Sequence, residues 1–174
     1  MSLLVVSYPE IAHRHAEWIE AVRQRHSFLT HSVLAPHVTF VFPLHNVPED
    51  ELLAHVGLVT AGQPRIRFVL RISMLVKDDS SDNYYVLLAP DEGFSDIVRL
   101  HDKLYTGMLT PMLRLDLPFI PHITVGGSPD VLGCKSVVDV LNAENFAIEG
   151  GIAYLDVVSK EAETVRTVKR FALG

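Results

Sequence analysis

The sequence has few of the features that mark secreted or membrane-spanning proteins. Its 174 residues include a single cysteine, Cys134, so no internal disulfide can form, which suits a reducing cytoplasm. No apolar run approaches the roughly 20 residues that a membrane-spanning helix requires. The apolar run at residues 3–6 has no basic residue ahead of it, so we expect no signal peptide. These absences predict a cytoplasmic protein that has no membrane partner.

Positive charge is also scarce. The chain carries 15 Lys and Arg against 21 Asp and Glu, a net charge of −6. Proteins that hold long nucleic acids through their phosphates need many basic side chains, because counterion release supplies much of the affinity. The charge balance therefore disfavours a long duplex as a partner. It favours a small phosphorylated substrate or a nucleic-acid end.

Nothing in the sequence nominates a metal site or another cofactor. The chain has nine histidines, but none has a recognised ligand spacing, and no cluster of cysteines or carboxylates accompanies them. A zinc site that used His37 and His122 would still need a third ligand. His101 lies on the apolar face of its predicted helix, where we expect a hydrogen-bonded core residue.

The sequence contains one short motif that occurs twice. Pro36-His37-Val38-Thr39-Phe40 recurs as Pro121-His122-Ile123-Thr124-Val125. Side chains of a β-strand alternate between its two faces, so the histidine and the threonine of each copy share one face. Repetition at long spacing indicates two related halves, which would bring two imidazoles and two hydroxyls into one cleft. The alternative is that both histidines are core residues bonded to local backbone.

Hydrophobic periodicity predicts an α+β protein whose two halves follow the same order: strand, helix, motif strand, helix, hairpin. We predict one pseudo-duplicated domain over residues 1–174, with pseudo-repeats at about 1–83 and 84–174. The predicted strands are 3–8, 37–42, 66–76, 84–88, 118–125, 145–158 and 164–172, and the predicted helices are 9–25, 52–59, 94–108 and 128–142.

Three local features refine this prediction. Gly126-Gly127 is expected to end the second motif strand. Ser128 would cap the following helix, with proline as its first residue. Gly150-Gly151, inside a long strand signal, indicates a β-bulge.

The paired motifs suit acid–base chemistry at phosphorus. The unperturbed pKa of histidine, about 6.5, allows it to accept or donate a proton near neutrality. One imidazole can take a proton from an attacking water or hydroxyl while the other protonates the departing oxygen. The two threonine hydroxyls can donate hydrogen bonds to phosphate oxygens that gain charge.

In these motifs and in its order of elements, the chain resembles the two-histidine (2H) phosphoesterase superfamily of LigT-like 2′-5′ RNA ligases and cyclic phosphodiesterases. The resemblance covers essentially the whole chain and implies a bilobal, pseudo-twofold α+β fold, in which two antiparallel sheets carry helices on the outside and face a central cleft. It implies that His37 and His122 are the acid–base pair, that Thr39 and Thr124 hold the phosphate, and that no metal takes part. Tyr85 matches a position where cyclic phosphodiesterases carry an aromatic residue near the nucleoside.

The resemblance predicts a phosphodiesterase that hydrolyses 2′,3′-cyclic phosphates or 2′-5′ linked ribonucleotides, and we expect the protein to be a monomer. Two alternatives stay open at this point. One is a non-catalytic module that binds a nucleotide or an RNA end. The other is a 2′-5′ RNA ligase, which the acidic net charge makes less favoured than hydrolysis.

Overall fold

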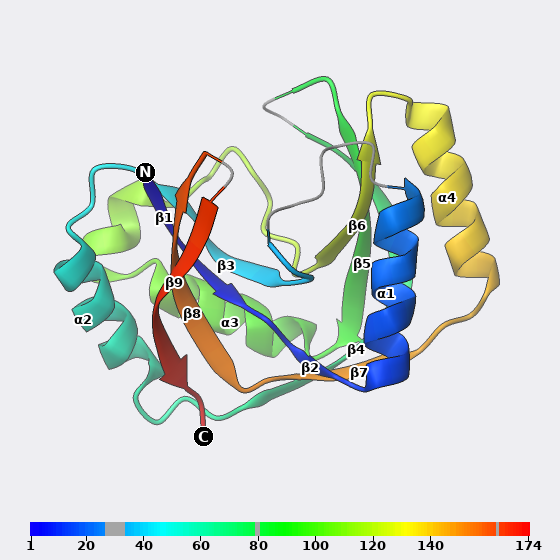
Figure 1. Ribbon diagram of the computed structural model, residues 1–174. Helices are drawn as coiled ribbons and strands as arrows, with labels where there is room; N and C mark the ends of the chain where they lie inside the picture. The colour runs from blue at the N-terminus through cyan, green and yellow to red at the C-terminus, as the bar shows by residue number, and fades with distance from the viewer. Residues whose placement is uncertain (27–33, 79–80, 163) are drawn as a thin grey trace.

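Two antiparallel sheets form the framework of the protein (Figure 1). The computed structural model describes residues 1–26, 34–78, 81–162 and 164–174. The first sheet has the strand order β3-β1-β8-β9 and the second the order β2-β7-β4-β5-β6. The first contains β1 (Ser2–Ser7), β3 (Val38–Leu44), β8 (Tyr154–Glu161) and β9 (Thr164–Ala172). The second contains β2 (Glu10–Ile11), β4 (Ile66–Lys77), β5 (Tyr84–Glu92), β6 (Ile123–Ser128) and β7 (Ile148–Ile152).

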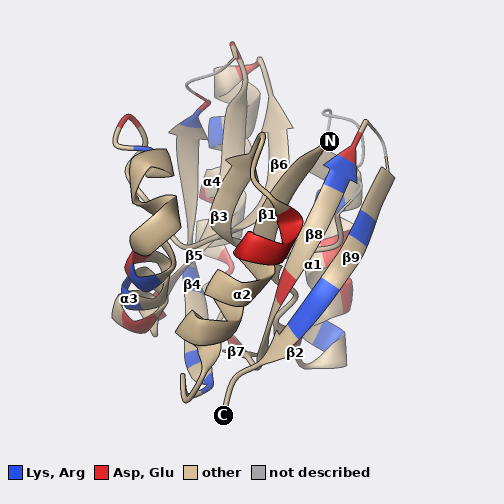
Figure 2. Cartoon of the chain, turned by 90° about the vertical axis from the view of Figure 1, so that its left-hand side faces the viewer, with Lys and Arg blue, Asp and Glu red and all other residues tan. Residues whose placement is uncertain are grey.

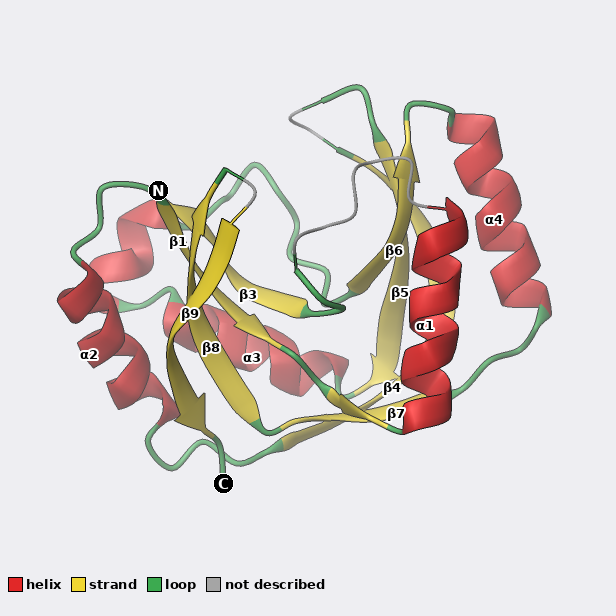
Figure 3. Ribbon diagram, viewed as in Figure 1, coloured by secondary structure: helices red, strands yellow, loops and turns green. Residues whose placement is uncertain are grey.

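The helices cover one face of each sheet, which we call its outer face, as Figure 3 shows. Helices α2 (Glu49–Thr60) and α3 (Phe94–Leu104) pack on the first sheet, against β9 and β3. Helices α1 (His13–His26) and α4 (Val131–Ala143) pack on the second, against β6 and against β4 to β6. A 3-10 helix, η1 (Gly107–Met112), follows α3. The predicted α+β class, with two antiparallel sheets and external helices, is confirmed.

One continuous core lies beneath these outer faces. It includes Val38 and Phe40 of the first motif strand and Ile123 and Val125 of the second, all at most 2% exposed. Alternation then places the intervening motif residues on the opposite, inner faces. A small second cluster of Leu4, Val6 and Val158, with Tyr8 packed against it, lies on the inner face of the first sheet.

Each sheet takes strands from both halves of the sequence. The first sheet pairs β1 and β3 with β8 and β9, and the second pairs β4 with β5 and β7. The two halves of the sequence therefore do not correspond to the two sheets. The repeat boundary near residue 83 stays a prediction. None of the described helices is long and apolar enough to cross a membrane.

The prolines and glycines around the second motif act differently from the prediction. The strand begins at Ile123 rather than at residue 118, because Pro118 and Pro121 have no N–H to donate to a neighbouring strand. It then continues through Gly126 to Ser128, so the glycine pair does not end it. A Cβ at Gly126 would lie 3.0 Å from the His26 carbonyl oxygen, so glycine allows α1 to approach the strand closely.

Three further predictions are wrong. The N-cap of α4 is Asp130, whose carboxylate accepts from the amides of Leu132 and Gly133, rather than Ser128. Residues 145–158 form two strands, β7 and β8, which belong to different sheets. No bulge occurs at Gly150-Gly151, where the pairing of β7 with β4 is regular. Gly150 instead makes room for the Phe68 ring, since a Cβ there would lie 2.4 Å from Phe68 Cζ.

Candidate active site

The four motif residues occupy the inner faces where the two sheets approach each other. His37, Thr39 and His122 are half-buried, and Thr124 is exposed. The starts of β3 and β6, which carry them, lie near the centre of the molecule in Figure 1. The alternation expected from the motifs is therefore present in both strands. A purely structural role would bury these four side chains, whereas all of them keep some exposure to solvent.

Both imidazoles are oriented by the same contact. His37 Nδ1 lies 2.8 Å from the carbonyl oxygen of Ala35, and His122 Nδ1 lies 2.6 Å from that of Ile120. A carbonyl only accepts, so in each ring Nδ1 carries the hydrogen and Nε2 keeps the lone pair when the ring is neutral. The intervening prolines, Pro36 and Pro121, restrict the backbone that presents those carbonyls. The rings do bond local backbone, yet these bonds do not use the second nitrogen of either ring.

The two imidazoles influence each other electrostatically. Burial lowers the pKa of His37 from its ordinary 6.5, and the charge of His122 lowers it further, against the opposing hydrogen bond to Ala35. Burial likewise lowers the pKa of His122, against the hydrogen bond to Ile120. Residues 85 positions apart in the sequence thus lie within electrostatic range of each other. Two neighbouring imidazoles resist being charged together, so protonation of one ring disfavours protonation of the other.

Further cations surround the first motif. Arg23 on α1 and Lys160 on β8 also act on the pKa of His37, lowering it after the larger effects of burial and of His122. Arg23 donates to the carbonyl oxygen of Leu34 at 2.9 Å and to Glu20 at 3.0 Å. Despite the acidic net charge of the chain, the surroundings of His37 are positive, which suits an anionic ligand.

Tyr8 is a neighbour of His37 that the sequence did not indicate. Its ring lies edge-on to the His37 ring, with 6.3 Å between centroids. The contact follows from the pairing of β1 with β3, in which Val6 lies opposite Thr39 and Ser7 opposite Val38. No local motif marks Tyr8, Arg23 or Lys160, and only the strand pairing could have identified Tyr8.

Tyr85 lies on the same inner face as Thr124. On β5 it follows the alternation of Leu87, which pairs directly with Thr124. Tyr85 is half-buried, and its hydroxyl donates to Asp78 Oδ2 at 3.3 Å. Burial and the Asp78 carboxylate raise its pKa. The position is compatible with the predicted nucleoside contact, which stays a prediction.

A buried histidine connects the two motif segments. His101 on α3 is 3% exposed, and its Nδ1 donates to the carbonyl oxygen of Phe40 in the first motif strand at 2.8 Å. Its ring stacks on Phe119, just before the second motif, with 3.6 Å between centroids and 6° between planes. The expectation of a hydrogen-bonded core residue is confirmed. The same side chain also fixes the two motifs relative to each other.

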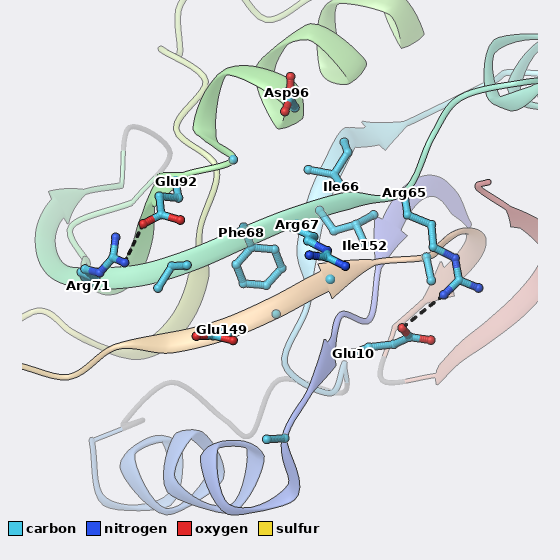
Figure 4. Close-up of a pocket in the computed structure, with 16 residues that line it drawn as sticks. Glu10, Arg65, Ile66, Arg67, Phe68, Arg71, Glu92, Asp96, Glu149 and Ile152 are labelled. Atoms are coloured by element: carbon cyan, nitrogen blue, oxygen red, sulfur yellow. Dashed lines mark hydrogen bonds and ion pairs between the residues drawn. The ribbon is translucent and has the colours of Figure 1, made fainter.

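A groove of about 1250 Å³ lies apart from the motifs, on β2, β4 and β7, and contains none of their histidines or threonines (Figure 4). Its charges are mixed: Arg71 pairs with Glu92 at 2.6 Å, and Arg65 lies 3.8 Å from Glu10. Because Arg65 and Arg71 face carboxylates, these two arginines are less available to an anionic ligand. We therefore place the candidate site at the motifs.

The part of the chain that the structure describes contains no group of three His, Cys, Asp or Glu side chains able to hold a metal ion. Cys134 is buried, as expected of a small core residue.

Comparison with known proteins agrees with this fold. The family model of the 2′-5′ RNA ligase superfamily matches residues 11–164. Among solved structures, TT0787 of Thermus thermophilus is similar with a TM-score of 0.66 and 16% identity, over 99% of this chain and 98% of that one. E. coli LigT complexed with 3′-AMP is similar with a TM-score of 0.57 and 18% identity, over 99% and 97%.

A third similar structure is Usb1 of Kluyveromyces marxianus, with a TM-score of 0.56 and 10% identity over 96% of this chain and 97% of that one. Other E. coli LigT structures contain ATP and NADP+. No curated protein sequence matches this chain. The family match spans most of the chain, and the solved structures share its fold across nearly its full length. The chain therefore belongs to the 2′-5′ RNA ligase superfamily, the 2H phosphoesterase family that its paired motifs predict.

Proposed function

We propose that this protein is a metal-independent phosphodiesterase that hydrolyses 2′,3′-cyclic phosphates or 2′-5′ linkages of ribonucleotides with two histidines. The observation that carries the proposal is the matched anchoring of the rings. Each imidazole gives its Nδ1 hydrogen to a backbone carbonyl and keeps Nε2 for proton transfer. The nucleotides bound in LigT structures support a small nucleotide or an RNA end as the ligand.

In this mechanism one ring accepts a proton and the other donates one. The neutral imidazole takes a proton from water, and the water oxygen bonds to phosphorus. The bond from phosphorus to one ribose oxygen breaks, and the protonated imidazole gives its proton to that oxygen. Thr39 and Thr124 donate hydrogen bonds to the non-bridging oxygens. We assign His37 the role of the base, because the charges of Arg23 and Lys160 favour its neutral form, which can accept a proton.

The direct test is incubation with a panel of 2′,3′-cyclic nucleotides, with and without EDTA. We expect nucleoside monophosphate to form at the same rate in both conditions, because the proposed proton transfers need no metal. Chromatography of the products measures the outcome. Tight binding without product would instead indicate a binding module, and joining of RNA ends would indicate a ligase.

The pH optimum of the reaction provides a second prediction. The base works above its pKa and the acid below its own, and both pKa values lie below the ordinary 6.5 of histidine. The profile of kcat/KM against pH, which reports the free enzyme, should therefore be bell-shaped with its maximum below about pH 6.5. A value of kcat/KM that still rises above about pH 7.5 would contradict the assignment.

A further inference from the structure

A row of side chains crosses the inner face of the first sheet from the first motif to its far edge. Thr39 on β3 pairs with Val6 on β1, Val6 pairs with Asp156 on β8, and Asp156 pairs with Arg170 on β9. Directly opposed residues of antiparallel strands have side chains on the same face. Arg170 therefore shares the face of Thr39. Neighbouring strands lie about 4.8 Å apart, so the two backbones are separated by about 14 Å.

The Arg170 side chain is held by a buried carboxylate. Arg170 Nε and Nη2 donate to the two oxygens of Asp156 at 2.8 and 2.9 Å. The Asp156 side chain is 1% exposed, whereas that of Arg170 is 55% exposed. The guanidinium also lies over the Tyr154 ring, 5.2 Å from its centroid. These contacts fix an exposed cation in one orientation.

The contact with Asp156 leaves the outer edge of the guanidinium unused. A guanidinium has five N–H donors, and this ion pair employs one on Nε and one on Nη2. Both donors on Nη1 and the second on Nη2 remain, in the geometry that binds a phosphate through two parallel hydrogen bonds. Within the described residues no other hydrogen bond to Arg170 is found.

The ion pair also lies close to the candidate site. The charge of Asp156 raises the pKa of Tyr8, after the larger effect of burial, and the charge of Arg170 lowers it. Tyr8 therefore lies within electrostatic range of the ion pair, while its ring contacts His37. Figure 2 shows Lys and Arg along β9, whereas β8 carries Lys160 together with Asp156 and Glu161.

Stability alone gives little reason for this arrangement. Exposed ion pairs contribute little net stability, and replacement of buried pairs by apolar residues is often neutral or stabilising. The Asp156–Arg170 pair, in which only the carboxylate is buried, is therefore weak evidence of a purely structural role. A guanidinium that is preoriented and still exposed is instead well suited to recognise an anion.

We propose that Arg170, oriented by Asp156, binds a second phosphate of the substrate, beyond the phosphate that reacts between His37 and His122. This inference rests on the proposed function and specifies its substrate. The preferred substrate would carry at least two phosphates, either along an RNA chain or as a 5′-phosphate on the reacting nucleotide. Arg170 is then a binding residue, and Asp156 is a positioning residue that acts through it.

Kinetics with three substrates test the proposal. The substrates are a nucleoside 2′,3′-cyclic phosphate, the same compound with a 5′-phosphate, and an RNA trinucleotide that ends in a 2′,3′-cyclic phosphate. Arg170→Ala should raise KM about tenfold for substrates with a second phosphate, the loss expected for one charge-assisted contact, and leave the first substrate unchanged. A rise for the trinucleotide alone would identify the RNA chain as the source of the second phosphate.

Two further variants keep the test decisive. Arg170→Lys retains a charge beside Asp156, so it protects folding, but it loses the planar pair of donors and should still raise KM for the same substrates. Lys169→Ala is the matched control. It removes an equal charge one residue away on the outer face, where Lys169 lies over Phe171, and should change KM for none of the three. Equal changes for all three substrates in the Arg170 variants, or no change for any, would overturn the inference.

A binding measurement separates this inference from the proposed function. If the wild-type protein hydrolysed none of the three substrates, the proposed function would fail. Fluorescence anisotropy with a labelled trinucleotide that ends in a 3′-phosphate would then decide the role of Arg170. Arg170→Ala should weaken binding and reduce the slope of log K against log salt by about 1. An unchanged affinity and slope would reject the second phosphate site.

Discussion

Replacing either His37 or His122 with alanine is expected to lower kcat on a cyclic-phosphate substrate by about 10² to 10⁴-fold. In the proposed mechanism each ring performs one of the two proton transfers. Loss of the base leaves water unactivated, and loss of the acid leaves the ribose oxygen to depart as an alkoxide. Initial rates at saturating substrate, measured for each variant at its own optimal pH, provide the test.

Asparagine at the same positions separates chemistry from structure. The amide nitrogen of asparagine occupies nearly the place of Nδ1, so His37→Asn and His122→Asn can keep the hydrogen bond to the backbone carbonyl while they lose Nε2. We expect them to be as inactive as the alanine variants but closer to the wild type in thermal stability. His45→Ala, at an exposed histidine beyond β3, is the matched control and should retain full activity. Full activity in either His37 or His122 variant would refute the two-histidine mechanism.

Truncation of His101 to alanine should produce the largest loss of stability among the histidines that the structure describes. The Phe40 carbonyl would lose its donor inside the protein, which costs about 1–3 kcal/mol. The vacated volume beside Phe119 would add a cavity cost. Since domains of this kind are stable by only about 5–15 kcal/mol, chemical denaturation should report a clear decrease in the free energy of unfolding.

Two substitutions divide this loss into its parts. His101→Asn can keep a donor to the Phe40 carbonyl without the stacked ring, and His101→Phe can keep the ring without the donor. His55→Ala is the control, because His55 Nε2 also bonds a carbonyl, that of Leu104 at 2.8 Å, but from a half-buried position without a stacked partner. The prediction would be wrong if His101→Ala were no less stable than His55→Ala.

The parts of the fold that follow from local pattern were predictable from the sequence. The alternation of Ile66 to Val76 predicts a strand and its return at Tyr84, and β4 and β5 form that antiparallel hairpin. Alternation also predicts which motif side chains share a face, because the period of a strand is fixed by its backbone. The matched histidines and threonines were predictable for the same reason, because both copies of the motif lie in segments that have the pattern of a strand.

The parts that depend on distant residues were not predictable. The break between β7 and β8 at Ala153 follows from pairing with β4 on one side and with β1 and β9 on the other. The role of Gly126 depends on how closely α1 approaches, which no local signal encodes. The same holds for Arg170, which reaches the inner face of the first motif only through three successive strand pairings.

The backbone contacts of the two imidazoles have a consequence for how mutations affect this protein. In many enzymes a carboxylate orients the catalytic imidazole, and a single substitution of that carboxylate misaligns the ring. Here the partners are main-chain carbonyls, which every amino acid supplies, so no exchange of side chains at positions 35 or 120 removes them. Ring orientation should instead be vulnerable at the prolines that shape those carbonyls. Substitutions that change the backbone path should therefore disturb ring orientation more than substitutions of the side chains at positions 35 and 120.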